Sequence, residues 1–149
     1  MILLLKFTKA FLLVDKISQK YIKIDHNVPA KLVGVRTNAT DFIPLQISDD
    51  HTEYALKSKN DDLFLDIIDD FNNIGGTKAV STEKRNISII LDSNLSYQIK
   101  LPTGYVYHDV KSGLLKTEAF NKDTHKGFEL FPMRTDKKYS ELLNNTLLM

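Results

Sequence analysis

The residues NISIILDSNLSYQIKL, at positions 86–101, form two short runs rich in isoleucine, leucine and tyrosine around a polar centre. The centre, Asp92-Ser93-Asn94, is a plausible tight turn between two strands. The stretch YVYHDVKSGLLKTEAF at positions 105–120 has the same form around Lys111-Ser112-Gly113, where Gly113 can take a positive φ. Both stretches predict antiparallel β-hairpins.

Further β-type runs separated by turn residues fill much of the chain. They cover residues 2–7, 10–14, 21–24, 30–36, 42–47, 53–57 and 128–133. Pro44 has no N–H to donate and predicts that its strand lies at a sheet edge. We expect about eight strands, paired antiparallel because parallel pairs need long crossovers. No internal repeat stands out.

Residues 61–74, DDLFLDIIDDFNNI, have a different period. Leu63, Phe64, Ile67, Ile68 and Phe71 recur at helical spacing, with Asn60 as an N-cap and Gly75-Gly76 as a stop. This pattern predicts an inserted amphipathic helix, and Thr135 or Asp136 predicts the start of a C-terminal helix at about 136–147. The expected fold is mainly β or α+β, an antiparallel sandwich or barrel, in a single domain over residues 1–149.

Interaction candidates lie on both expected helices. On the first helix, Asp62, Asp66, Asp69 and Asp70 would form one acidic stripe, with Asp69 and Asp70 at the unfavourable end of the helix dipole. The stripe indicates a solvated face or a docking surface for a basic partner, and changing Asp69 and Asp70 to Asn should stabilise an isolated subunit. On the second helix, Leu142, Leu143 and Leu147 would share a face that packs on the core or on another subunit.

Bulk composition excludes several classes of protein. The net charge of +1 provides no global field for nucleic acid, and the absence of cysteine excludes disulfides and thiolate chemistry. The apolar N-terminal run is interrupted by Lys6 and Lys9, so we expect a core strand or buried helix over residues 1–14 and no membrane span. No cofactor is expected, and the expected location is the cytoplasm or a virion.

Each of the four histidines, His26, His51, His108 and His125, has an acidic residue within two positions. Such loops could bind a metal or supply an acid–base pair only if two or more of them converged in space. None of the established catalytic spacings is present, so no catalytic or metal-ligating residue is assigned. Separately, Tyr105 and Tyr107 share one strand face, and basic residues mingle with Phe120 over 111–126, which is compatible with stacking on single-stranded nucleic acid.

The leading hypothesis is a non-enzymatic structural or assembly protein that forms a homo-oligomer or larger assembly. A strand-rich domain with one inserted helix resembles small phage structural proteins, so a virion or tail component is one form of this hypothesis. The alternatives are a nucleic-acid-binding β-domain and a metal-assisted hydrolase that uses the His/Asp loops. Fold alone does not choose among them.

Overall fold

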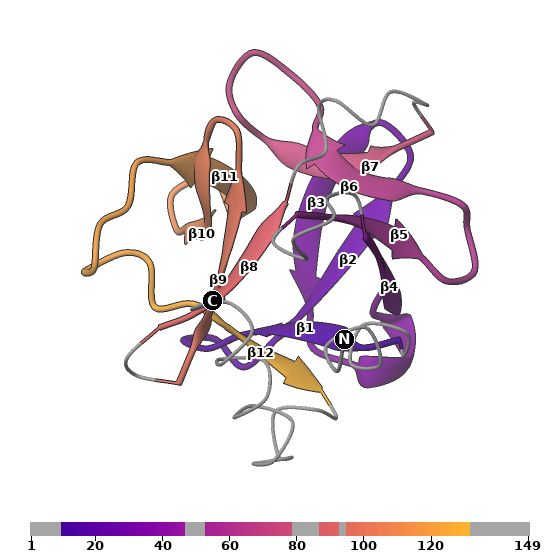
Figure 1. The fold of residues 1–149 in the computed structure, drawn as a ribbon, viewed down its shortest axis with the longest axis horizontal. Helices are drawn as coiled ribbons and strands as arrows, with labels where there is room; N and C mark the ends of the chain where they lie inside the picture. Colours follow the sequence, from indigo (N-terminus) through magenta and orange to yellow (C-terminus); the bar gives the residue numbers. More distant parts are fainter. Residues whose placement is uncertain (1–9, 47–52, 79–86, 93–94, 132–149) are drawn as a thin grey trace.

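The computed structural model describes residues 10–46, 53–78, 87–92 and 95–131, and in this part of the chain it is built almost wholly from antiparallel β-strands (Figure 1). One 3-10 turn, Arg36–Asn38, is present, and the described residues contain no α-helix. The strands are β1 Leu12–Asp15, β2 Tyr21–Asp25, β3 Val28–Val33, β4 Phe42–Gln46, β5 Tyr54–Ser58, β6 Phe64–Ile67, β7 Ile74–Thr77, β8 Ser88–Leu91, β9 Tyr97–Leu101, β10 Gly104–Asp109, β11 Leu114–Glu118 and β12 Phe128–Phe131. The prediction of a mainly β fold is confirmed.

Six strands close into a ring. β1 pairs with β12, β4 with β5, β8 with β9, and β9 with β12. Single bridges complete the ring between β1 and β4, at Phe11 and Phe42, and between β5 and β8, at Tyr54 and Ile87. Since the ring has no free edge within it, the barrel is the architecture that the structure has.

The described strands form three similar units of four, and each unit contributes its first and last strand to the ring. Phe11, Tyr54 and Tyr97 are spaced 43 residues apart and are all buried; Tyr54 and Tyr97 begin β5 and β9, and Phe11 directly precedes β1. Two positions further on, Leu13, Leu56 and Ile99 are also buried. The chain therefore repeats a structural pattern that its sequence shows only as single apolar positions, and the interpretation that it has no internal repeat is wrong at the level of structure.

The second and third strands of each unit form a hairpin: β2–β3, β6–β7 and β10–β11. Each hairpin buries one side chain at the same register, namely Ile22, Leu65 and Val106. The hairpins contact one another through β3, β7 and β11, which pair at Pro29–Gly75 and bridge at Asn73–Lys116. This packing joins the three units away from the ring.

The predicted helix at 61–74 is wrong. The segment forms β6, a turn and β7, and Leu63, Leu65 and Ile74 enter the core with the alternation of strands. Phe71, which the helix would have buried, is 75% exposed at the turn. Long-range pairing overrides the local helical spacing, because β6 and β7 complete a unit that the barrel requires.

The hairpin and N-terminal strand predictions are confirmed where the structure describes the residues. Both quoted hairpins are confirmed as β8–β9 and β10–β11, with Gly113 at φ +75°. The strand prediction at 10–14 is confirmed by β1, whereas residues 1–9 and the predicted helix at 136–147 lie outside the described residues. In the described part of the chain, no helix has the length and apolar character that crossing a membrane needs.

Candidate functional site

Two residues depart from the pattern that the three units share. On the second hairpin, Ile67 lies opposite Ile74, and at the same place on the third hairpin His108 lies opposite Leu115. In the ring, Ser58 faces Phe42, whereas Asp15 faces Phe128 at the equivalent place. A histidine and a carboxylate therefore occupy core-facing positions of the repeat, and departures of this kind are expected at functional sites.

Both residues line the same small cavity, of about 40 Å³, which we call the histidine hollow. It lies between the end of β1, β10 and the segment that leads into β12. Its walls are formed by Asp15, Ile17, Val106, Tyr107, His108, Val110, Thr124, His125, Lys126, Gly127 and Phe128. Two of the predicted histidine loops thus converge here.

His125 has a structural part in this arrangement. The Asn121 backbone N–H donates to its Nδ1 at 3.0 Å, so Nε2 carries the proton and donates to the Tyr105 carbonyl at 3.2 Å. The residue is buried, and both ring nitrogens are satisfied. Through these hydrogen bonds, His125 holds the loop before β12 against β10, and neither ring nitrogen is left to act as a base.

Three aromatic rings surround His125 on the outer side of β10, and we call Tyr105, Tyr107, Phe120 and His125 the aromatic patch. The ring centroids of Tyr107 and Phe120 lie 5.2 and 5.5 Å from that of His125, and Tyr105 meets Phe120 edge-on at 5.4 Å. Phe120 is 51% exposed. The Lys100 ammonium lies 5.7 Å from the centroid of the Tyr105 ring. The patch thus presents an exposed apolar ring beside a fixed cation.

Tyr107 joins the patch to nearby carboxylates. Burial raises the pKa of Tyr107, and the charges of Glu118 and Asp109 together with a side-chain hydrogen bond to Glu118 raise it further. The Thr124 hydroxyl also donates to Glu118, at 3.2 Å. Tyr107 therefore stays protonated at neutral pH, and its hydroxyl donates a hydrogen bond to the Glu118 carboxylate.

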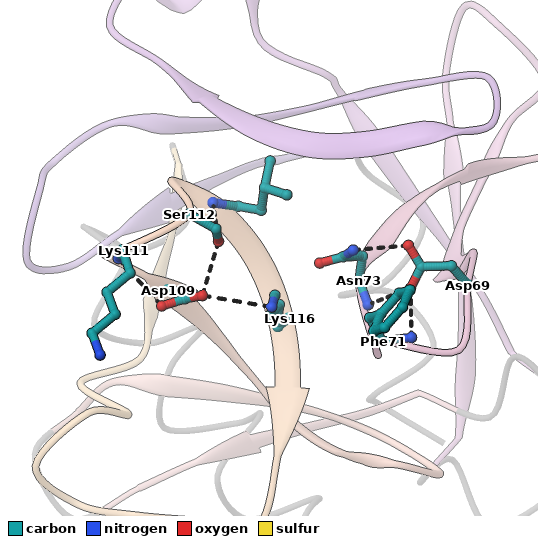
Figure 2. A network of polar contacts seen from close by, with 8 residues as sticks. Asp69, Phe71, Asn73, Asp109, Lys111, Ser112 and Lys116 are labelled. Atoms are coloured by element: carbon teal, nitrogen blue, oxygen red, sulfur yellow. Dashed lines mark hydrogen bonds and ion pairs between the residues drawn. The ribbon is translucent and has the colours of Figure 1, made fainter.

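Two clusters of polar contacts, one on the second hairpin and one on the third, form what we call the polar network (Figure 2). Asp109 accepts from the Ser112 hydroxyl at 2.9 Å and forms an ion pair with Lys116 at 3.6 Å. Across the hairpin boundary, Asp69 accepts from the Asn73 side chain at 2.8 Å and from the Phe71 backbone N–H at 2.9 Å. The ammonium of Lys116 therefore influences carboxylates of both hairpins.

The network lowers the pKa of both carboxyl groups. Burial alone would raise the pKa of Asp69, but hydrogen bonds from Asn73 and Phe71 and the charge of Lys116 together hold it below its ordinary value. For Asp109, the Ser112 hydrogen bond is the main cause of the lowered pKa, burial opposes it, and Lys111 and Lys116 add to it. Each carboxylate therefore stabilises the fold most when it is ionised.

An Asp69→Asn variant should be less stable than the wild type at pH 7 and close to it at pH 3. A folded pKa below the unfolded one gives stability that is present above the ordinary value of about 4 and is lost as the pH falls below it. Urea midpoints at both pH values measure this difference. Asp70→Asn is the matched control, because Asp70 is exposed and should change neither midpoint. A more stable Asp69→Asn variant at pH 7 would contradict the network.

The structure separates the four aspartates that the helix would have aligned. Asp62 lies in the turn before β6 and forms an ion pair with Lys57 at 3.0 Å. Asp66 is buried within β6, and Asp69 and Asp70 lie in the turn that follows. These four side chains form no acidic stripe and lie on no helix, so changing Asp69 and Asp70 to Asn is not expected to stabilise the chain. Leu142, Leu143 and Leu147 lie outside the described residues.

The other histidines do not extend the hollow. His26 is exposed at the β2–β3 turn and bridges to Gly76, and His51 lies outside the described residues. Among residues 10–46, 53–78, 87–92 and 95–131, no three His, Cys, Asp or Glu side chains group so that they could hold a metal ion. The described residues therefore give no support to the metal-assisted alternative.

Comparison with solved structures defines the class of fold as β-trefoil-like. One similar structure is the designed three-fold symmetric protein ThreeFoil, with a TM-score of 0.68, 11% identity, and coverage of 81% of this chain and 96% of that protein. Another is a GlcNAcα1-4Gal-releasing endo-β-galactosidase from Clostridium perfringens, with a TM-score of 0.67, 14% identity and coverage of 82% of this chain. This chain spans only 32% of the galactosidase, and at these identities the likeness concerns the fold alone. No protein-family model and no curated protein matches the sequence.

Proposed function

We propose that this chain is a non-enzymatic structural or assembly protein that self-associates through the aromatic patch, as a virion or tail component would. The observation that carries the proposal is the exposure of Phe120. Its ring packs against the buried ring of His125, yet the residue is 51% exposed. Aromatic side chains dominate the binding energy of protein interfaces because they bury a large area with few rotatable bonds. Location in the cytoplasm or in a virion is part of the same proposal.

The surroundings of Phe120 also support a contact surface. Its neighbour Tyr105 is already ordered by Lys100 and by the backbone contact with His125, so little conformational entropy is lost when a partner docks. Charged groups of both signs, Lys100 and Glu118, lie beside the rings on adjacent strands. An apolar centre with a polar rim is the usual composition of an interface.

Light scattering against protein concentration tests this proposal. We expect the wild type to form a species larger than the 17.0 kDa chain, and Phe120→Ser to raise the concentration needed for assembly at least about tenfold, equivalent to about 1.4 kcal/mol. Val35→Ser removes an exposed apolar side chain from the first unit and should leave assembly unchanged. A wild type that stays monomeric at high concentration, or a Phe120→Ser variant that assembles normally, would overturn the proposal.

A second candidate, binding of single-stranded nucleic acid, is favoured by the Lys100–Tyr105 contact in the same patch. Bases stack on exposed aromatic rings, and a neighbouring lysine can pair with phosphate. Retention of an oligonucleotide that weakens as salt is added would favour this candidate, whereas assembly without added nucleic acid favours the first.

A further inference from the structure

The carboxylate of Asp15 is the unusual group of the histidine hollow. The residue is only 5% exposed, and its carboxylate accepts a hydrogen bond from the Ser18 backbone N–H at 2.9 Å. Within the described residues, its other oxygen has no hydrogen-bond or ion-pair partner. A buried carboxylate is costly unless it is paired, so this position has capacity for a cation.

His108 supplies a second open group. It is half-buried in the wall of the hollow, and in the described part of the chain neither ring nitrogen makes a hydrogen bond. A neutral imidazole can accept one hydrogen bond through its unprotonated nitrogen. Asp15 and His108 come from different units of the fold, and both replace the apolar or small residues of the equivalent positions.

Other charges near the hollow leave room for a cation. Lys126 lines the wall, but its ammonium donates to the Lys122 carbonyl at 3.0 Å. Lys16, next to Asp15, donates to the Ser96 hydroxyl at 2.7 Å. His125 is engaged on both ring nitrogens, and Tyr107 donates to Glu118. The unused acceptors that remain are therefore on Asp15 and His108.

The size and edges of the hollow limit the group that it can take. A volume of about 40 Å³ suits a group little larger than a water molecule, such as an ammonium, better than a planar guanidinium. Ile17 and Val110, which also line it, are 65% and 83% exposed and so mark its open side. Two exposed apolar side chains can cover the methylene stem of a lysine.

We infer that the histidine hollow receives a lysine side chain of a protein partner, with the ammonium paired to Asp15 and hydrogen-bonded to His108. The inference rests on the proposed function in one respect, since the lysine belongs to a partner surface. It adds an acidic, lysine-specific contact next to the apolar contact at Phe120. Charge-assisted bonds to a shielded carboxylate then fix the orientation in which the partner docks.

The test uses n-butylammonium chloride as the probe and n-butanol as its uncharged match, each titrated into the full chain and followed by two-dimensional 1H–15N NMR. We expect saturable shifts of the amides around Asp15, His108 and Val110 with butylammonium, with a dissociation constant in the millimolar range. Asp15→Asn, which keeps the shape and removes the charge, should weaken binding at least about fivefold. His26→Ala changes an exposed histidine outside the hollow and should leave binding unchanged.

His108→Ile is the second variant, and it guards against loss of binding by unfolding. It installs the residue that the other two units carry at this place, so it should raise the urea midpoint while abolishing the butylammonium shifts. Equal shifts with butanol, or an unchanged dissociation constant in Asp15→Asn, would overturn the inference. Because neither measurement needs a partner, failure here is distinct from failure of assembly at Phe120.

Discussion

A Gly75→Ala variant should lose about 3 kcal/mol of its free energy of unfolding, because β7 approaches β3 too closely for any side chain. A Cβ atom at Gly75 would lie 2.2 Å from the backbone carbonyl oxygen of Val28 and 3.0 Å from a methyl carbon of Ile68. The carbonyl belongs to the backbone and cannot rotate away, so the strand pair at Pro29 and Gly75 must separate. Overpacking of a rigid site typically costs about 1–3 kcal/mol or more.

Urea denaturation of Gly75→Ala and Gly34→Ala measures this effect with a matched control. Gly34 has no atom within 4 Å of the Cβ position, so alanine there should change the free energy of unfolding by no more than about 0.5 kcal/mol. If Gly75→Ala were as stable as the control, β3 and β7 would not pair as the structure has them. The comparison therefore tests the contact between the first and second hairpins directly.

Gly75 also explains why the sequence pattern at residues 61–74 predicted a helix where the structure has two strands. Gly75-Gly76 after an apolar run is typical of a helix C-terminus, and the spacing of Leu63, Ile67 and Phe71 agrees with a helix. The structural reason for the glycines is the distant carbonyls of Val28 and Asp25, which local sequence cannot reveal. Asn72, which has a positive φ, lies in the turn that connects β6 to β7.

Hairpins were predictable because their determinants are local. The β-type runs around Asp92 and around Gly113 contain both the alternation and the turn residue, and both hairpins form as predicted. The three-unit repeat was not predictable in the same way. Its units share burial at equivalent positions, such as Phe11, Tyr54 and Tyr97, while most of the residues between them differ in type. That these positions are equivalent becomes clear only from the strand pairing in the ring.

The candidate site was predictable in part. Neighbouring acid drew attention to His108 and His125, and Tyr105, Tyr107 and Phe120 were recognised as a potential stacking face. Their meeting around one loop depends on hydrogen bonds from His125 to the backbone of β10 and of its own loop, which no spacing encodes. Asp15 could have been noticed as the charged residue that ends an apolar run, but the β10 residues that line the hollow with it lie about 90 positions further along the chain.

A Leu56→Ala variant should lose about 3–5 kcal/mol of its free energy of unfolding, which is the usual cost of truncating a fully buried leucine. Leu56 is fully buried, pairs with Pro44 of the neighbouring strand β4, and occupies the same place in its unit as Leu13 and Ile99 do in theirs. Surrounding strands are closed into the ring and cannot collapse into the space left behind, so the cavity term adds to the lost transfer free energy. Leu45→Ala, on the neighbouring strand but 42% exposed, should cost less than about 1 kcal/mol.

Urea denaturation of both variants and of Leu13→Ala measures these costs. Because the two leucines occupy equivalent places, Leu13→Ala and Leu56→Ala should agree within about 1 kcal/mol, and a small cost at either would contradict the three-unit ring.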